Sequence, residues 1–324
     1  MAETVTHEDA QYALDIVRAI CTEVGPGLPG TPQERERAAI IKKELESRLG
    51  AGNVTVEEFT FAPAAFLRSS PIIALFTLFA TLLNLSTSHL TWVSPWLTSV
   101  AALVLSILSP LLFLFEFFLG RELTDPLFRK GRSLNVVGGL RKPGTKTVKR
   151  LLIVSGHHDS APEDTWLRFL KYGFFFLSAT WGIGLITLLA ASAIQLAGLI
   201  LGSAGLVRFG ALHWALLAYP IVPSIFFALF KTRGWKNGGN VPGAADNLSA
   251  CALAVATCRF LVRNPTYIPD DTEIRFISFG SEEAGCRGSR RYVARHLEEL
   301  RHLDARQLNF ETIAHPEIVI LTFK

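Results

Sequence analysis

Two long stretches without charged residues constrain the fold of this chain more than any other feature. Residues 71–119 carry one formal charge, Glu116, and residues 172–207 and 209–230 carry none. A transmembrane helix needs roughly 20 apolar residues, so each stretch is long enough to span a bilayer. The 324 residues are 49% hydrophobic and 19% charged, whereas soluble domains usually have about 25% charged residues. The composition excludes a disordered chain and disfavours a purely soluble one.

The first apolar block divides into two helices. A polar break over Asn84–Pro95 separates segments 71–88 and 96–118, which hydropathy predicts as a membrane hairpin. An unusually large buried helical core is the alternative, but uninterrupted apolar runs lack the amphipathic pattern of helices that pack at a surface.

The second apolar block allows two divisions. One gives two helices, 172–203 and 209–230, with a turn near Gly205–Gly210; the other gives three shorter spans with a further break near Ala190–Ser192. Two prolines, Pro220 and Pro223, are expected to kink the last span, because proline cannot donate a helical hydrogen bond.

Positive charges flank both blocks only at the ends that return to the polar chain. They are Arg68, Arg121, Arg129, Lys130, Arg132, Arg168, Lys171, Lys231, Arg233 and Lys236. The far loops contain His89 and Arg208, and the acidic N-terminus lacks the apolar region of a signal peptide. The positive-inside rule therefore predicts a multi-pass membrane protein whose polar domain is cytoplasmic. With a net charge of +4 and no basic run, the chain shows no nucleic-acid footprint.

The polar remainder predicts an α/β domain. Its expected helices and strands alternate: helices 7–21, 33–49, 245–263 and 286–300, with strands 53–61, 133–140, 150–155, 273–280, 307–313 and 317–323. Thr31 is the expected N-cap of the second helix, with Pro32 at its first position. The alternation predicts a mixed, mostly parallel sheet with helices on both faces. Four cysteines without CxxC spacing, Cys21, Cys251, Cys258 and Cys286, are interpreted as free thiols.

Three polar clusters follow expected strands or begin a helix. They are Ser155–Ser160, which includes His157 and Asp159; Gly243–Asn247, which includes Asp246; and Ser281–Glu283. In α/β sheets, ligands bind at the carboxyl ends of strands, and imidazole and carboxylates suit Zn²⁺. Each cluster alone has an ordinary explanation: a loop histidine pair, a helix N-cap and a solvated first helical turn. Their common context favours a metal site.

These motifs resemble the two-zinc aminopeptidases of the bacterial leucyl aminopeptidase and aminopeptidase Y type, relatives of glutamate carboxypeptidase and glutaminyl cyclase. The matching segments are Gly156–Ser160, Gly243–Ser249, Phe279–Gly285 with Gly288–Arg290, the strand Leu308–Glu311 and the turn Gly27–Thr31. The resemblance implies a zinc exopeptidase fold, interrupted here by two membrane hairpins. The expected peptidase segments are 1–65, 123–165 and 239–324, and the membrane insertions are 66–122 and 166–238.

The resemblance also implies roles for six residues. His157 would bind one zinc, Asp246 would bridge two zincs, and Glu283 would bind the other. Glu282 would be the general base, Asp159 would orient His157, and Glu311 would replace the family's aspartate as a further ligand. The implied activity is hydrolysis of peptide substrates by a zinc-bound hydroxide, with a glutaminyl-cyclase-like acyl transfer or a non-catalytic membrane protein as alternatives.

The family's last zinc ligand, a downstream histidine, has no counterpart before Lys324. His315 lies only four residues after Glu311, at the wrong place in the pattern, and His296 and His302 lie in or just after an expected helix. We expect either a C-terminally truncated fragment, which is preferred, or one weak zinc site. Because His157 and Asp246 must meet on one membrane face, the block between them must contain an even number of spans. We therefore predict four spans in two hairpins; the sequence leaves substrate specificity and oligomeric state open.

Overall fold

The computed structural model describes residues 4–89, 93–208, 210–229 and 239–313. The chain forms two compact units. The sheet unit comprises Met1–Pro63, Lys130–Pro162 and Gly239–Lys324, and the helical unit comprises Ala64–Arg129 and Glu163–Gly238. The insertions predicted at 66–122 and 166–238 lie within the helical unit.

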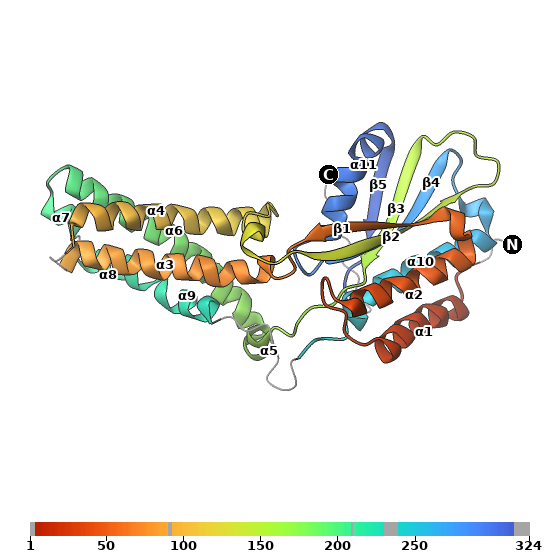
Figure 1. Ribbon diagram of the computed structural model, residues 1–324, viewed down its shortest axis with the longest axis horizontal. Helices are drawn as coiled ribbons and strands as arrows, with labels where there is room; N and C mark the ends of the chain where they lie inside the picture. The colour runs from red at the N-terminus through yellow and green to blue at the C-terminus, as the bar shows by residue number, and fades with distance from the viewer. Residues whose placement is uncertain (1–3, 90–92, 209, 230–238, 314–324) are drawn as a thin grey trace. The chain divides into compact units, whose positions relative to one another are not determined.

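The sheet unit contains a five-stranded sheet in the order β1-β2-β4-β3-β5 within the described residues (Figure 1). Its strands are β1 (Val54–Phe61), β2 (Gly131–Arg141), β3 (Arg150–His157), β4 (Thr272–Phe279) and β5 (Asp304–Asn309). Strand β2 pairs antiparallel with β1 and β4, and β3 pairs parallel with β4 and β5. The predicted mixed sheet is confirmed, although parallel pairings account for half of the four rather than most of them.

Helices cover both faces of this sheet, as predicted (Figure 1). Helices α1 (His7–Glu23), α2 (Pro32–Leu49) and α10 (Ser249–Arg263) pack on one face, and α11 (Arg287–His302) packs on the other. Consecutive residues of β2 point to opposite faces of the sheet. Val136 lies in the hydrophobic core beneath α1, α2 and α10, and Val137 packs with Tyr292 of α11. This period of two is the pattern expected of a strand buried on both sides.

Local signals account for the bounds of several elements. The Thr31 hydroxyl accepts a hydrogen bond from the Glu34 backbone N–H at 3.3 Å, and Pro32 is the first residue of α2, as expected. Strand β5 begins three residues before the predicted 307, because its polar and largely exposed residues give no apolar alternation. The strand expected at 317–323 and His315 lie outside the described residues.

The helical unit is built from the two apolar blocks. The first forms α3 (Ala65–His89) and α4 (Pro95–Phe113), followed by a wider helical turn, η2 (Leu114–Phe118). The only charged residue of this block, Glu116, is buried and accepts a hydrogen bond from the Thr124 backbone N–H at 2.7 Å. A buried formal charge requires such a partner.

The second block contains one long helix and several short ones. After α5 (Thr165–Leu170), helix α6 (Tyr172–Ile200) passes through Ala190–Ser192 without a break, which overturns the three-span division. The rest of the block forms α7 (Ala204–Val207), α8 (Gly210–Ala218) and α9 (Ile221–Ala228). The break between α8 and α9 falls at Pro220, where a kink was expected.

Each apolar block leaves and re-enters the sheet unit at adjacent residues. Phe61, before the first block, pairs with Gly131 after it. Pro162, before the second block, forms an isolated bridge with Asn240 after it, and the Val241 N–H donates to the Ala161 carbonyl at 3.2 Å. The two ends of each block are therefore attached to the sheet unit at neighbouring residues.

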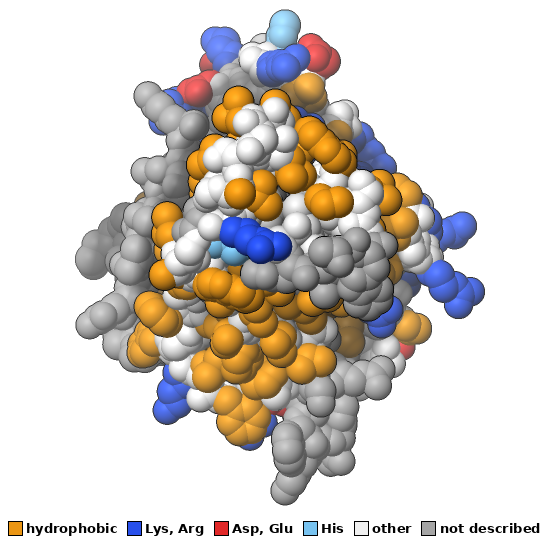
Figure 2. All heavy atoms as spheres, turned by 90° about the vertical axis from the view of Figure 1, so that its left-hand side faces the viewer, with side chains coloured by type: hydrophobic (Ala, Val, Ile, Leu, Met, Phe, Trp, Pro, Cys, Tyr) orange, Lys and Arg blue, Asp and Glu red, His pale blue; other side chains and the backbone are white. Residues whose placement is uncertain are grey.

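The surface of the helical unit is apolar. Figure 2 shows hydrophobic side chains over much of one face, and Phe79, Leu82 and Leu97 are more than half exposed. The four candidate spans in this unit, 65–88, 95–118, 172–200 and 204–228, have at most 39% of their most apolar windows buried. These values argue against a large buried helical core, since such a core would cover these side chains.

A fifth segment long and apolar enough to span a membrane, Ala244–Arg263, includes α10. Its window is 56% buried, and its residues Cys251, Val255 and Cys258 lie in the core between α10 and the sheet. We therefore assign α10 to the sheet unit, where it carries the residues that follow Asp246. The four cysteines are free in the structure, as predicted.

Candidate metal centre

The candidate site lies around His157, the last residue of β3. Its side chain is almost fully buried, and its Nδ1 atom lies 3.3 Å from Asp159 Oδ1. The opposite ring atom, Nε2, lies 3.1 Å from Asp246 Oδ1, 3.2 Å from Glu311 Oε1 and 3.7 Å from Glu282 Oε2. One imidazole nitrogen thus faces carboxylates from three separate segments of the sheet unit.

The structure brings the predicted ligands together in two overlapping groups. His157, Asp246 and Glu311 form one group, and His157, Glu282 and Glu283 form the other; ligand atoms within each group lie within 4.8 Å of one another. His157 occurs in both groups, whereas the resemblance assigns the bridging position to Asp246. Among the described residues, a single imidazole therefore serves the whole site.

Asp159 makes contacts beyond those expected from the sequence. Its carboxylate is fully buried, and its two oxygens accept hydrogen bonds from the backbone N–H groups of Glu282 and Glu283, both at 3.0 Å. Although burial alone would raise the pKa of Asp159, the adjacent His157 imidazole lowers it. Asp159 thereby fixes both the imidazole and the turn that carries the two glutamates.

The electrostatics of the cluster favour a cation. Burial and the nearby charges of Asp159 and Asp246 raise the pKa of Glu283 to about 8, and burial raises the pKa of Glu282. Burial opposes protonation of His157, but the nearby carboxylates of Asp159, Asp246 and Glu311 raise its pKa. Carboxylates crowded around one imidazole nitrogen repel one another, and a divalent cation relieves this repulsion. The donor set of nitrogen and carboxylate oxygens fits Zn²⁺.

Gly156 explains how His157 comes close to the segment that carries Asp246. A Cβ atom at Gly156 would lie 2.5 Å from the Cβ of Ala250 and 2.9 Å from the backbone nitrogen of Cys251. Only glycine allows β3 to approach α10 this closely. The motif glycine is therefore required by packing beneath the site.

Hydrogen bonds connect the remaining motif segments. The Asn247 side chain donates to the Phe310 carbonyl at 2.9 Å, which ties the residue after Asp246 to the residue before Glu311. The Cys286 thiol donates to Glu282 Oε1 at 3.1 Å. The sequence predicted no part in the metal site for Asn247 or Cys286, although both lie within or beside the quoted motifs.

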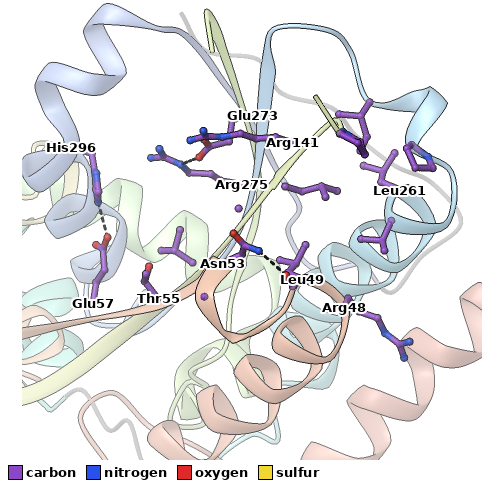
Figure 3. Close-up of a pocket in the computed structure, with 18 residues that line it drawn as sticks. Arg48, Leu49, Asn53, Thr55, Glu57, Arg141, Leu261, Glu273, Arg275 and His296 are labelled. Carbon is purple, nitrogen blue, oxygen red and sulfur yellow. Dashed lines mark hydrogen bonds and ion pairs between the residues drawn. The ribbon is translucent and has the colours of Figure 1, made fainter. Parts of the chain in front are cut away.

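Two other histidines have separate roles. His158 is fully buried, points its Nδ1 at Ser278 Oγ (2.8 Å), and has its pKa lowered by burial to about 4, so it stays neutral. His296 Nε2 lies 2.6 Å from Glu57 Oε1. This pair lines a cavity of about 700 Å³, which contains none of the six predicted site residues (Figure 3). Arg141 and Glu273, which also line the cavity, form an ion pair. Because the cavity lacks the predicted site residues, we place the candidate site at His157.

Comparison with known proteins finds a family model that matches the C-terminal part of the chain. Residues 230–322 match the model of peptidase family M28. The matched segment contains Asp246, Glu282, Glu283 and Glu311, whereas His157 lies before it. The resemblance drawn from the motifs is therefore confirmed.

Individual proteins similar to this chain include one curated relative and two solved structures. Aminopeptidase YwaD of Bacillus subtilis (strain 168) is 44% identical over 69 residues, which are 21% of this chain and 14% of that protein. A zinc aminopeptidase from Bacillus subtilis aligns at 14% identity with a TM-score of 0.44, over 94% of this chain and 69% of that one. An Acidobacteriales bacterium glutaminyl cyclase aligns at 10% identity with a TM-score of 0.45, over 97% and 61%. The chain thus covers less than two thirds of the curated relative and of the cyclase.

Proposed function

We propose that this chain is a membrane-embedded zinc exopeptidase, most specifically an aminopeptidase. One observation carries the proposal: His157 Nε2 faces the carboxylates of Asp246, Glu311 and Glu282 within 3.7 Å. All three carboxylates lie in the segment that matches peptidase family M28. The donor chemistry and the family match both support a zinc-dependent peptidase.

Each residue of the cluster has a role in this proposal. His157, Asp246, Glu283 and Glu311 would hold zinc, two ions by resemblance. Zinc supplies Lewis acidity, which polarises the scissile carbonyl and lowers the pKa of water toward about 7. Glu282 accepts the proton from the attacking water and passes it to the leaving amine. Asp159 holds the His157 imidazole with Nε2 toward the carboxylates and fixes the backbone of Glu282.

The decisive experiment is Glu282→Gln in the purified full chain, with hydrolysis of amino-acid amides and zinc content measured on the same sample. We expect loss of hydrolysis with zinc content nearly unchanged, because the proton acceptor is removed while the expected ligands remain. Glu298→Gln, which changes an exposed residue of α11, is the matched control and should leave both measurements unchanged. Hydrolysis retained by Glu282→Gln would exclude the proposed general base.

Acyl transfer of the glutaminyl-cyclase type is a second candidate. The observation that favours it is that both candidate ligand groups contain the same histidine, His157. One imidazole nitrogen coordinates one ion, and the glutaminyl cyclases that these motifs resemble hold a single zinc. Pyroglutamate formation from an N-terminal glutamine peptide, together with one zinc per chain, would support the cyclase. A protein that binds no zinc and turns over neither substrate would instead support the non-catalytic alternative.

We also propose that the helical unit spans the bilayer four times, with the sheet unit in the cytoplasm. The apolar surface of α3, α4, α6 and the segment 204–228 supports the spans. The adjacent ends of each block support an even number of spans per block. The positive charges at the returning ends support the cytoplasmic orientation.

Sided cysteine labelling tests this topology. In a background without the four native cysteines, His89→Cys and Val207→Cys should react from the side opposite Ser47→Cys, an exposed position of α2 in the sheet unit. Labelling of all three positions from one side would contradict the four-span proposal.

A further inference from the structure

Two buried charged residues of α2 lie outside the predicted site. Glu34 and Arg37 are both fully buried, whereas the other charged residues of α2 are exposed or only partly buried. Residues three apart lie on the same face of a helix. Burial of a charged side chain is costly unless hydrogen bonds compensate it, so the partners of these two residues identify their roles.

Among the described residues, the Arg37 side chain donates hydrogen bonds to backbone carbonyls only. Its Nε donates to the Gly25 carbonyl at 2.9 Å, and its Nη1 donates to the His158 carbonyl at 3.1 Å. Its Nη2 donates to the carbonyls of Gly25 and Pro242. His158 directly follows His157, and Pro242 lies four residues before Asp246. The Arg37 guanidinium thus joins the backbones of the two segments whose side chains meet at His157 Nε2.

The fit around Arg37 is tight. Gly243 adopts a positive φ of 67°, and a Cβ atom there would lie 2.8 Å from the Ser160 Cβ and 3.3 Å from Arg37 Nη1. The Ser160 hydroxyl accepts a hydrogen bond from the Gly27 N–H at 3.0 Å. The segments after β3 and before α10 therefore pack against each other with little free space around the guanidinium.

Glu34 holds the third motif segment. Its Oε1 accepts hydrogen bonds from the hydroxyls of Ser281 (2.7 Å) and Ser133 (2.8 Å), and its Oε2 accepts one from the Gly30 N–H (2.6 Å). Ser281 directly precedes Glu282 and adopts a φ of 54°, which is uncommon for a residue other than glycine. The bond from Ser281 to Glu34 stabilises this strained turn, from which Glu282 and Glu283 project.

We propose that Glu34 and Arg37 are positioning residues of the metal centre, and that α2 sets the relative placement of its three motif segments. Arg37 aligns His157 with Asp246, and Glu34 fixes the turn of Glu282 and Glu283. This inference rests on the proposed zinc site. A positioning role differs from a general contribution to folding, because the zinc affinity of the folded protein then depends on both Glu34 and Arg37.

The test measures zinc affinity by competition with a chromogenic chelator, using the full chain in detergent. The variants are Arg37→Met, Arg37→Lys and Glu34→Gln, with folding checked by circular dichroism. Loss of a residue that orients metal ligands typically lowers metal affinity about 10–100-fold. We expect this loss in Arg37→Met and Glu34→Gln, and a smaller loss in Arg37→Lys, because lysine keeps the charge but cannot reach all three carbonyls.

The matched control is Arg35→Met on the same helix. Arg35 forms a partly exposed ion pair with Glu58 at 3.0 Å, so its loss should leave zinc affinity unchanged. Kinetics add a second readout: kcat should fall more than KM rises in the Arg37 and Glu34 variants, because the proton acceptor and the metal are misplaced while substrate contacts remain.

The outcomes separate this inference from the proposed function. A wild-type chain that binds no zinc would refute both. Wild-type zinc affinity and kcat in folded Arg37→Lys and Glu34→Gln would refute the positioning role alone. Should Arg37→Met fail to fold, these two milder variants still decide the question.

Discussion

The close contact between β3 and α10 gives a sharp prediction about Gly156→Ala. The added methyl group would lie 2.5 Å from the Ala250 Cβ, and because carbon atoms pack at about 3.5–4.0 Å, the two elements must separate by about 1 Å. Overpacking of this kind costs about 1–3 kcal/mol, which corresponds to a fall in melting temperature of about 2–12 °C for a unit of this size.

The same displacement would move His157 away from Asp246. These residues lie directly after Gly156 and shortly before Ala250, and their nearest atoms are 3.1 Å apart. We therefore expect zinc affinity to fall together with stability in Gly156→Ala. Thermal unfolding in detergent, followed by circular dichroism, and chelator competition measure the two effects on one preparation.

A double-mutant cycle isolates the contact. Ala250→Gly removes the clashing methyl group but costs about 1 kcal/mol as a glycine within a helix. The double variant should be less destabilised than the sum of the single variants, with incomplete rescue because the Cys251 nitrogen remains 2.9 Å away. Gly139→Ala is the control, since its nearest atom is 3.7 Å away. Full additivity, or equal effects of Gly156→Ala and Gly139→Ala, would show that the close contact between Gly156 and Ala250 does not limit the packing of β3 on α10.

Three further predictions concern other parts of the chain. Asp159→Asn should lower zinc affinity about 10–100-fold in chelator competition, because an amide cannot accept both backbone hydrogen bonds; unchanged affinity would contradict this. Burial raises the pKa of Cys251 to about 11 and that of Cys258 to about 12, so iodoacetamide at pH 8 should modify both only after unfolding, as mass spectrometry can determine. Trp181→Ala should destabilise the helical unit by about 3–5 kcal/mol in thermal unfolding, because Trp181 stacks on Phe227 at 4.1 Å; an unchanged melting temperature would rule out this packing.

The sequence predicted the central strands better than the edge. Strands β3 and β4 are neighbours near the centre of the sheet and are buried along most of their length, as their apolar residues predict. Strand β5 starts earlier than expected because Asp304–Gln307 is polar and lies at the edge within the described residues. Burial in a sheet leaves a clear apolar signal, whereas an exposed edge strand is defined mainly by backbone pairing.

The candidate site shows a similar division. The six expected residues stand in short motifs after strands or before a helix, so the sequence could nominate them together. Glu34 and Arg37 could not be recognised, because charged residues on an amphipathic helix ordinarily face solvent. Their burial follows from tertiary packing against segments more than 90 residues away, such as Ser133 and His158. The supporting contacts of the site therefore required the structure.

We propose that this chain hydrolyses peptide substrates with zinc held at the His157 cluster. The most direct test removes zinc with a chelator and then adds it back in steps, measuring release of the N-terminal residue from a short peptide against bound zinc. We expect hydrolysis to disappear with the metal and to return in proportion to bound zinc. Hydrolysis that persists without zinc, or zinc binding that restores no hydrolysis, would contradict this proposal.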